Sequence, residues 1–128
     1  MKNQLKRVLI ATGMGAILGI FCIIGQSQRM PLNPNPNATI YLLAAWYNRV
    51  IMGMLIGFAG EWFLLKNKPR LNSVVRGAIL GTVVSISFGL LQQRIEIMYF
   101  FAGIVWGLLN DLITTTLMNR ILKKSHLE

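Results

Sequence analysis

The sequence predicts an all-α fold: an integral membrane protein in which four transmembrane helices form two tandem helical hairpins. Of its 128 residues, 54% are hydrophobic and only 13% are charged, whereas about a quarter of the residues of a soluble domain are charged. The apolar residues gather in four blocks, at positions 8–25, 41–65, 73–91 and 97–118. Each block approaches the ~20 residues that a bilayer-spanning helix needs. The blocks use most of the chain, so we expect residues 1–128 to form a single transmembrane domain.

The distribution of basic residues predicts how the helices cross the membrane. The net charge is +9, and basic residues concentrate before the first block, between the second and third, and after the fourth. Because cytoplasmic loops carry the excess of lysine and arginine, we expect both termini and the middle connection to be cytoplasmic, in a multi-pass protein of the plasma membrane. The basic ends are also expected to contact anionic lipids of the bilayer. No basic stripe alternates with aromatic residues, so we expect no nucleic-acid partner.

The first block follows a basic leader, a combination that is also typical of a signal peptide. The residues after this block lack the small-residue pattern of a cleavage site, so we expect the block to remain as a span. In the next segment, 26–39, Pro31, Pro34 and Pro36 exclude a helix. We interpret this segment as an exposed outer loop, with a lid or a partner-binding loop as the alternative.

The second block carries small and charged residues on one helical face. At about 100° per residue, one arc of the helix contains Arg49, Gly53, Gly57, Gly60 and Glu61. This face lacks bulk and is charged at both ends, so we expect it to turn away from lipid and to be covered by the other helices.

Asn48 and Arg49 form a polar site in the outer half of this predicted span. A long basic side chain near a helix end usually extends its charged group to the headgroups, and we expect Arg49 to do so. The alternative is that Arg49 contacts an anion or a lipid phosphate.

Two short connections determine the course of the later helices. Pro69 is expected to stop the second helix, and Asn72 or Ser73 to cap the third. The turn at 92–96 is shorter still, which makes the third and fourth helices antiparallel neighbours.

Small residues at four-residue spacing predict close packing between helices. Short side chains let two helix backbones approach each other, and packing drives helix association in lipid. We therefore also expect a homo-oligomer, or contacts with other membrane proteins. The predicted packing residues are Gly15, Gly19, Gly53, Gly57, Gly60, Gly77, Gly81, Ser85, Gly89, Gly103 and Gly107.

An internal repeat relates the two predicted hairpins. The five residues 15–19 recur as residues 77–81. The second block reads Gly-x-x-x-Gly-x-x-x-Glu up to Glu61, and the fourth reads Gly-x-x-x-Gly-x-x-x-Asp up to Asp111. Two hairpins of one design in the same orientation predict a parallel repeat about an axis along the membrane normal.

The two intramembrane acids are the candidate functional residues. If the repeat holds, Glu61 and Asp111 face each other and, with Asn110 and Thr114, bind a cation or relay a proton. The sequence does not identify a metal for this site, and no cofactor is expected. The alternative is structural: each acid reaches the interface, pairs with a basic group or caps a neighbouring helix.

The predicted function is that of an oligomeric channel or transporter component that moves a small cation, a proton or a small solute. The alternative is a scaffold or accessory subunit that docks other membrane proteins through its glycine-rich faces. The sequence carries no HExxH, CxxC, GxSxG or P-loop motif, so we expect no enzyme. An intramembrane lipid-modifying activity on Glu61 and Asp111 is the remaining enzymatic alternative.

Overall fold

A computed structural model describes residues 2–28, 37–65, 68–91 and 97–125. It contains four long helices, and the predicted all-α fold is confirmed. All four are long and apolar enough to cross a membrane. They are α1 (Lys2–Ser27), α2 (Ala38–Phe58), α3 (Pro69–Leu91) and α4 (Ile97–Ser125), with a short 3-10 turn, η1 (Ala59–Glu61), after α2.

The helix bounds differ from the apolar blocks in ways that matter for the site. The second helix begins at Ala38 and ends at Phe58, before the end of the apolar block at position 65. Arg49 therefore lies near the middle of α2 instead of toward its outer end. Pro69, which was expected to stop the second helix, is instead the first residue of α3, a position where its missing N–H is tolerated.

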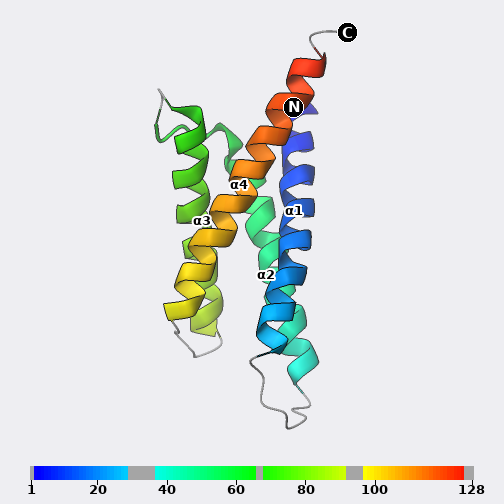
Figure 1. Ribbon diagram of the computed structural model, residues 1–128, viewed down its shortest axis with the longest axis vertical. Helices are drawn as coiled ribbons and strands as arrows, with labels where there is room; N and C mark the ends of the chain where they lie inside the picture. The colour runs from blue at the N-terminus through cyan, green and yellow to red at the C-terminus, as the bar shows by residue number, and fades with distance from the viewer. Residues whose placement is uncertain (1, 29–36, 66–67, 92–96, 126–128) are drawn as a thin grey trace.

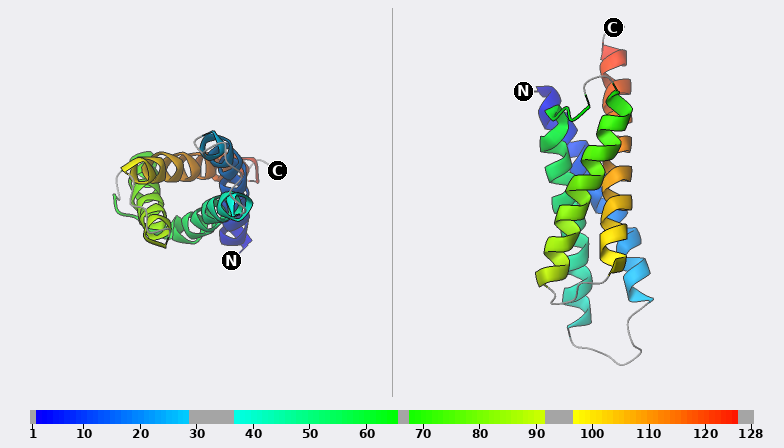
Figure 2. Two further views of the ribbon diagram at one scale, coloured as in Figure 1. Left: turned by 90° about the horizontal axis from the view of Figure 1, so that it is seen from below. Right: turned by 90° about the vertical axis from the view of Figure 1, so that its left-hand side faces the viewer.

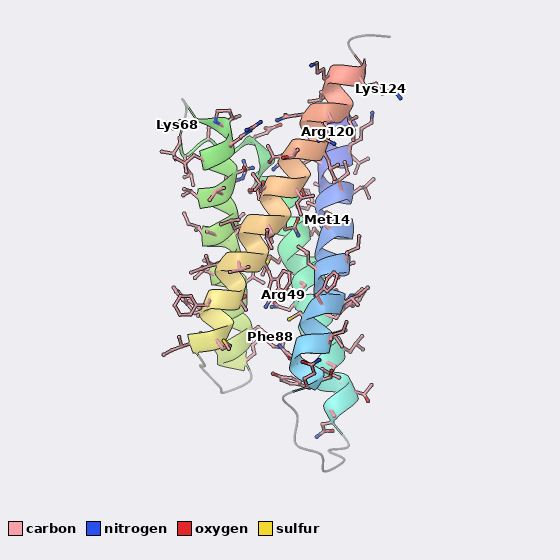
Figure 3. All side chains as sticks on the ribbon, in the orientation of Figure 1. Met14, Arg49, Lys68, Phe88, Arg120 and Lys124 are labelled. Atoms are coloured by element: carbon pink, nitrogen blue, oxygen red, sulfur yellow. The ribbon has the colours of Figure 1, made fainter. Side chains whose placement is uncertain are left out.

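The four helices stand around a common axis in chain order (Figure 2). The start of α1, the end of α4 and the described residues between α2 and α3 lie at the same end of the bundle (Figure 1). Lys68, Arg120 and Lys124 also lie at that end (Figure 3). The gathering of basic residues at one end is what the positive-inside rule expects of a cytoplasmic face. The predicted outer loop falls on residues 29–36, which lie outside the described part of the chain.

Packing is close within each hairpin and sparser between the hairpins. The contacts of α1 with α2, and of α3 with α4, far outnumber those that cross from one hairpin to the other. Glycine makes the close approach possible. A Cβ on Gly77 would collide with the carbonyl group of Gly107, and one on Gly81 would collide with that of Gly103. The glycine rows predicted from the sequence therefore lie where the helices of one hairpin touch.

The closest contacts in the two hairpins correspond, but not in the alignment of the sequence repeat. Gly15 meets the backbone of Arg49 and Gly53, whereas Gly81 meets the backbone of Gly103 and Gly107. Matching these contacts aligns Gly15 with Gly81, one helical turn away from the match in the sequence motif. The internal repeat stays a prediction, and the packing places its two halves in a different register.

The apolar interior is small, and the outer faces of the helices are apolar. Ala11, Met52, Ile56 and Val84 form the buried core. Outside, large apolar side chains are exposed on all four helices, among them Leu9, Phe21, Leu43, Phe58, Ile79, Leu90, Phe101 and Val105. A surface of this kind suits contact with lipid tails, in agreement with a multi-pass membrane protein.

Labelling of introduced cysteines tests the predicted orientation. In a Cys22→Ser background, a cysteine at Lys68 should react only with a reagent applied from the cytoplasm. A cysteine at Thr39 should react only with a reagent applied from outside. Both positions are exposed. Thr39 lies at the start of α2 and Lys68 directly precedes α3, and these two helices start at opposite ends of the bundle (Figure 1). The reverse pattern of labelling would overturn the assignment of the basic end to the cytoplasm.

Candidate functional site

An ionic cluster ties three helices together near the end of the bundle where α1 begins. We call it the arginine–aspartate cluster; its members are Arg7, Arg76, Asp111 and Thr115. Asp111 on α4 is fully buried. Arg76 on α3 binds it with two parallel bonds, Nε to Oδ2 at 2.7 Å and Nη2 to Oδ1 at 2.8 Å. Arg7 on α1 donates to Oδ1 at 2.7 Å, and the Thr115 hydroxyl donates to the same atom at 3.1 Å.

Arg76 also holds the chain just after α2, in η1 and the residue that follows it. Its Nη1 donates to the carbonyl oxygens of Gly60, at 2.8 Å, and Trp62, at 3.1 Å. The last carbonyls of a helix have no partner within that helix, so Arg76 supplies a donor where the chain leaves α2. One buried arginine thereby connects α3, α4 and the exit from the first hairpin.

Asn72 binds the backbone of residues 62–65, which follow η1. The prediction that it caps α3 is therefore replaced by a role in this connection. Its Oδ1 accepts the N–H groups of Leu64, at 2.6 Å, and Leu65, at 3.0 Å, and its Nδ2 donates to the carbonyl oxygen of Trp62. Ser73, the other predicted cap, is buried, and its hydroxyl donates to the carbonyl oxygen of Arg70. Asn72 therefore holds the connection between the hairpins, whereas the hydroxyl of Ser73 bonds within α3.

The predicted pairing of Glu61 with Asp111 is not found in the described part of the chain. Glu61 lies in η1 and is exposed, whereas both oxygens of Asp111 are bound by arginine. The reason is the register of the hairpins. By contacts, the residue of α2 that corresponds to Asp111 is Gly57, and Glu61 falls one turn farther along, beyond the end of the helix.

Asn110 and Thr114, which were predicted to join the acids in a cation or proton site, are buried and bond to neutral groups. Asn110 Nδ2 donates to the carbonyl oxygen of Ala11 at 3.2 Å, and the Thr114 hydroxyl donates to Asn110 Oδ1 at 3.2 Å. Because Gly53 has no side chain, the Asn110 amide can approach the first hairpin here. The result is a neutral polar link from α4 to α1. Among the described residues, no group of three histidine, cysteine or acidic side chains is placed to hold a metal ion.

A second polar group, which we call the Arg49 site, consists of Arg49, Met52 and Ser85. Arg49 is only 3% exposed, and Figure 3 shows it part-way along the bundle. Its Nη1 donates to the Ser85 hydroxyl on α3 at 2.9 Å and makes a long 4.0 Å contact with Met52 Sδ. Its Nε is buried and has no partner. The expectation that Arg49 extends to the headgroups is therefore wrong. Arg49 lies near the middle of α2, which runs from Ala38 to Phe58, and its side chain is buried among the other helices.

The electrostatics of the Arg49 site are unusual for a membrane interior. A charge at the centre of a transmembrane helix costs about 2.5–3.5 kcal/mol on insertion scales. No carboxylate among the described residues neutralises Arg49, and a guanidinium does not lose its proton in proteins. Asn48, the other member of the predicted outer-half site, is half-buried. The buried ionic groups of the described chain thus carry more positive than negative charge.

The ion pairs of Arg7 and Arg76 with Asp111 were hard to predict from the sequence, because arginine is also common at the cytoplasmic ends of transmembrane helices. Arg7 directly precedes the first apolar block and Arg76 lies near the start of the third, places where basic residues are common at the cytoplasmic ends of spans. A signal was nevertheless present: Arg7 continues the four-residue row that leads to Ala11 and Gly15. A charge in line with the small residues that form a helix contact is placed to enter the bundle.

Known proteins similar to this chain share one name. A UPF0397 protein of Lactococcus lactis subsp. cremoris, strain NZ9000, is 30% identical over 132 aligned positions, which cover 85% of this chain and 70% of that protein. The UPF0397 protein YdcD of Lactococcus lactis subsp. lactis, strain IL1403, has the same identity and coverage. In strain SK11 of subsp. cremoris, a UPF0397 protein is 30% identical and is covered over 67% of its length. No family model and no solved structure matches the chain.

Proposed function

The chain belongs to the family of UPF0397 proteins, and from that premise we propose that it is the membrane component of a transporter for a small solute. The observation that carries the proposal is the Arg49 site, a buried cation near the middle of α2 whose one hydrogen bond to another helix crosses to the second hairpin. Ionisable side chains inside a membrane domain are rare and typically mark a substrate or ion pathway. The Arg49 site lies where such a pathway would pass between the hairpins.

The division into hairpins supports this role. Each hairpin is held by close backbone contacts at its glycines, whereas the hairpins meet over fewer residues. Polar links connect them: Arg49 to Ser85, Arg7 to Asp111, and Asn110 to Ala11. Many transporters work by rocking one helical unit against another around a site at the middle of the membrane. Two tightly packed hairpins with a looser polar contact between them suit that motion.

The buried charges favour a solute over the cation or proton expected from the sequence. A cation site needs oxygen ligands that are free to bind, and both oxygens of Asp111 are already bound by arginine. Glu61 is exposed at the end of α2. With Arg7, Arg49 and Arg76 against one buried aspartate in the described chain, the interior would repel a cation.

An oligomer, or a complex with other membrane proteins, completes the proposed transporter. Four helices enclose little space, and their interior is filled by the core and the polar links. Helices of a second copy of this chain or of a partner would therefore complete the walls of the pathway between the hairpins, in the plasma membrane with both termini in the cytoplasm. No catalytic step is needed for this role.

Solute flux in liposomes tests the proposal. Vesicles that contain the purified protein should swell faster than empty vesicles in glycerol, inorganic phosphate or succinate, and their proton and potassium leak should match that of empty vesicles. Ser85→Ala should slow the flux because it removes the hydroxyl that Arg49 binds. Ser87→Ala is the matched control, because Ser87 is exposed and its hydroxyl donates only to Val83 of its own helix.

The absence of flux for all these solutes would contradict the proposal and favour the alternative role as a scaffold or accessory subunit. A proton or potassium flux above that of empty vesicles would instead support the hypothesis, drawn from the sequence, that the protein moves a cation or a proton. Equal flux in Ser85→Ala and Ser87→Ala would show that the pathway does not pass Arg49.

A further inference from the structure

Two arginines of this protein are equally buried, yet within the described part of the chain only one of them is paired with a carboxylate. Arg49 and Arg76 are each 3% exposed. Arg76 binds Asp111 through two bonds, whereas Arg49 binds a serine hydroxyl and contacts a methionine sulfur. Burying a charge is costly unless it is paired and hydrogen-bonded. The difference needs an explanation, because the same bundle neutralises one guanidinium and leaves the other without an acid among the described residues.

The two guanidinium groups differ in the use of one edge. In Arg76, the edge formed by Nε and Nη2 holds the two oxygens of Asp111. In Arg49, the hydrogen bonds made within the described chain come from Nη1, and Nε is buried without a partner. The edge that holds a carboxylate in Arg76 is therefore unoccupied in Arg49.

We propose that the Arg49 site binds an anionic group, a carboxylate or a phosphate, through the Nε–Nη2 edge of Arg49. Planar guanidinium forms two parallel hydrogen bonds with either anion. Ser85 adds a donor: its oxygen already accepts from Arg49, and its own proton is free to point to an anion oxygen. The hydroxyl of Ser87, by contrast, donates its hydrogen bond to a carbonyl oxygen of its own helix.

The bound anion would supply the negative charge that the bundle lacks at this level. Its source is either a soluble anion, such as a carboxylate-bearing or phosphate-bearing solute, or the phosphate of a lipid headgroup. The first source deepens the proposed function, on which it rests, by making the transported solute an anion. The second would make the Arg49 site a lipid-binding site, independent of transport.

Thermal unfolding of the purified full chain in a neutral detergent tests the site without any flux. Inorganic phosphate and succinate should each raise the melting temperature in a saturable manner, at constant ionic strength set with chloride. Arg49→Met should weaken this binding by roughly tenfold or more, since it removes a charge-assisted pair of bonds. Arg120→Met is the matched control, because Arg120 is exposed on α4, and it should bind as the unchanged protein does.

Two further measurements keep the result decisive. Without added anion, Arg49→Met should melt at the same temperature as the unchanged protein or higher, because it removes a buried charge that has no acid partner among the described residues. Ser85→Ala keeps the charge and should bind the anions several-fold more weakly, since one donor is lost. A lower melting temperature for Arg49→Met, with unchanged phosphate and succinate binding, would overturn the proposal.

The source of the anion is decided by a lipid arm of the same experiment. Stabilisation by phosphatidylglycerol, but not by phosphate or succinate, that is lost in Arg49→Met would assign the site to a headgroup. Stabilisation by none of the three probes would refute the anion site. Anion binding without flux in liposomes would leave the site in place and refute transport. Flux in liposomes together with no effect of Arg49→Met on anion binding would support transport and refute the anion site.

Discussion

Replacing Asp111 by asparagine should lower the free energy of unfolding by about 3–5 kcal/mol, the usual cost of removing one partner from a buried ion pair. The large value is expected because a single carboxylate serves two arginines. Both oxygens accept bonds of 2.7–2.8 Å from Arg7 and Arg76. The amide keeps the shape of the side chain but removes the charge and one acceptor. The buried Arg76 and the partly buried Arg7 would then have no acid partner among the described residues.

Thermal unfolding in detergent, or unfolding in a mixed-micelle denaturant titration, measures the loss. Glu61→Gln is the matched control, because it makes the same chemical change at an exposed acid in η1. It should change stability by only about 0.5 kcal/mol or less, as surface substitutions do. Similar losses in both variants would contradict the structure and favour a shared acidic site.

Gly81→Leu should destabilise the second hairpin by about 1–3 kcal/mol or more, the range for overpacking a close contact. A side chain at this position would collide with the carbonyl oxygen of Gly103, and the Cα of Gly107 would lie only 2.8 Å from the added Cβ. Backbone atoms cannot turn aside as a flexible side chain can, so the two helices must separate.

Gly13→Leu provides the control for this effect. Gly13 is an exposed glycine within α1, and a Cβ added there meets nothing within 4 Å. Leucine is a better helix former than glycine by up to about 1 kcal/mol, so Gly13→Leu should be neutral or stabilising. Thermal unfolding of both variants compares them directly. An unchanged melting temperature for Gly81→Leu would mean that the backbones of α3 and α4 do not touch.

The fold was predictable from the sequence because its signals are local. Four long apolar blocks require four spans, and glycines at four-residue spacing indicate where helices touch. The structure places Gly15, Gly53, Gly77 and Gly81 at such contacts. These inferences need only the length of a segment and the periodicity of a helix.

The candidate site was less predictable because it depends on where helices start and on how they are aligned. Hydropathy placed Arg49 toward one end of its span, but the helix runs from Ala38 to Phe58 and has Arg49 near its middle. Likewise, the repeat aligned Glu61 with Asp111, while the packing displaces the hairpins by a turn. The partners of Asp111 are distant in the chain: 104 residues separate it from Arg7 and 35 from Arg76. No local pattern encodes such separations.

The arginine–aspartate cluster has a consequence for biosynthesis. Arg7 enters the membrane with the first helix and Arg76 with the third, whereas Asp111, the acid that binds both, arrives with the fourth. Until the ribosome has delivered α4, neither arginine has its acid, and each is better placed at the hydrated headgroups, which a long side chain can reach. Docking of the two hairpins therefore follows insertion of the last helix. A chain truncated before Asp111 retains its first hairpin but loses the ion pair between Arg7 and Asp111 that joins this hairpin to the second.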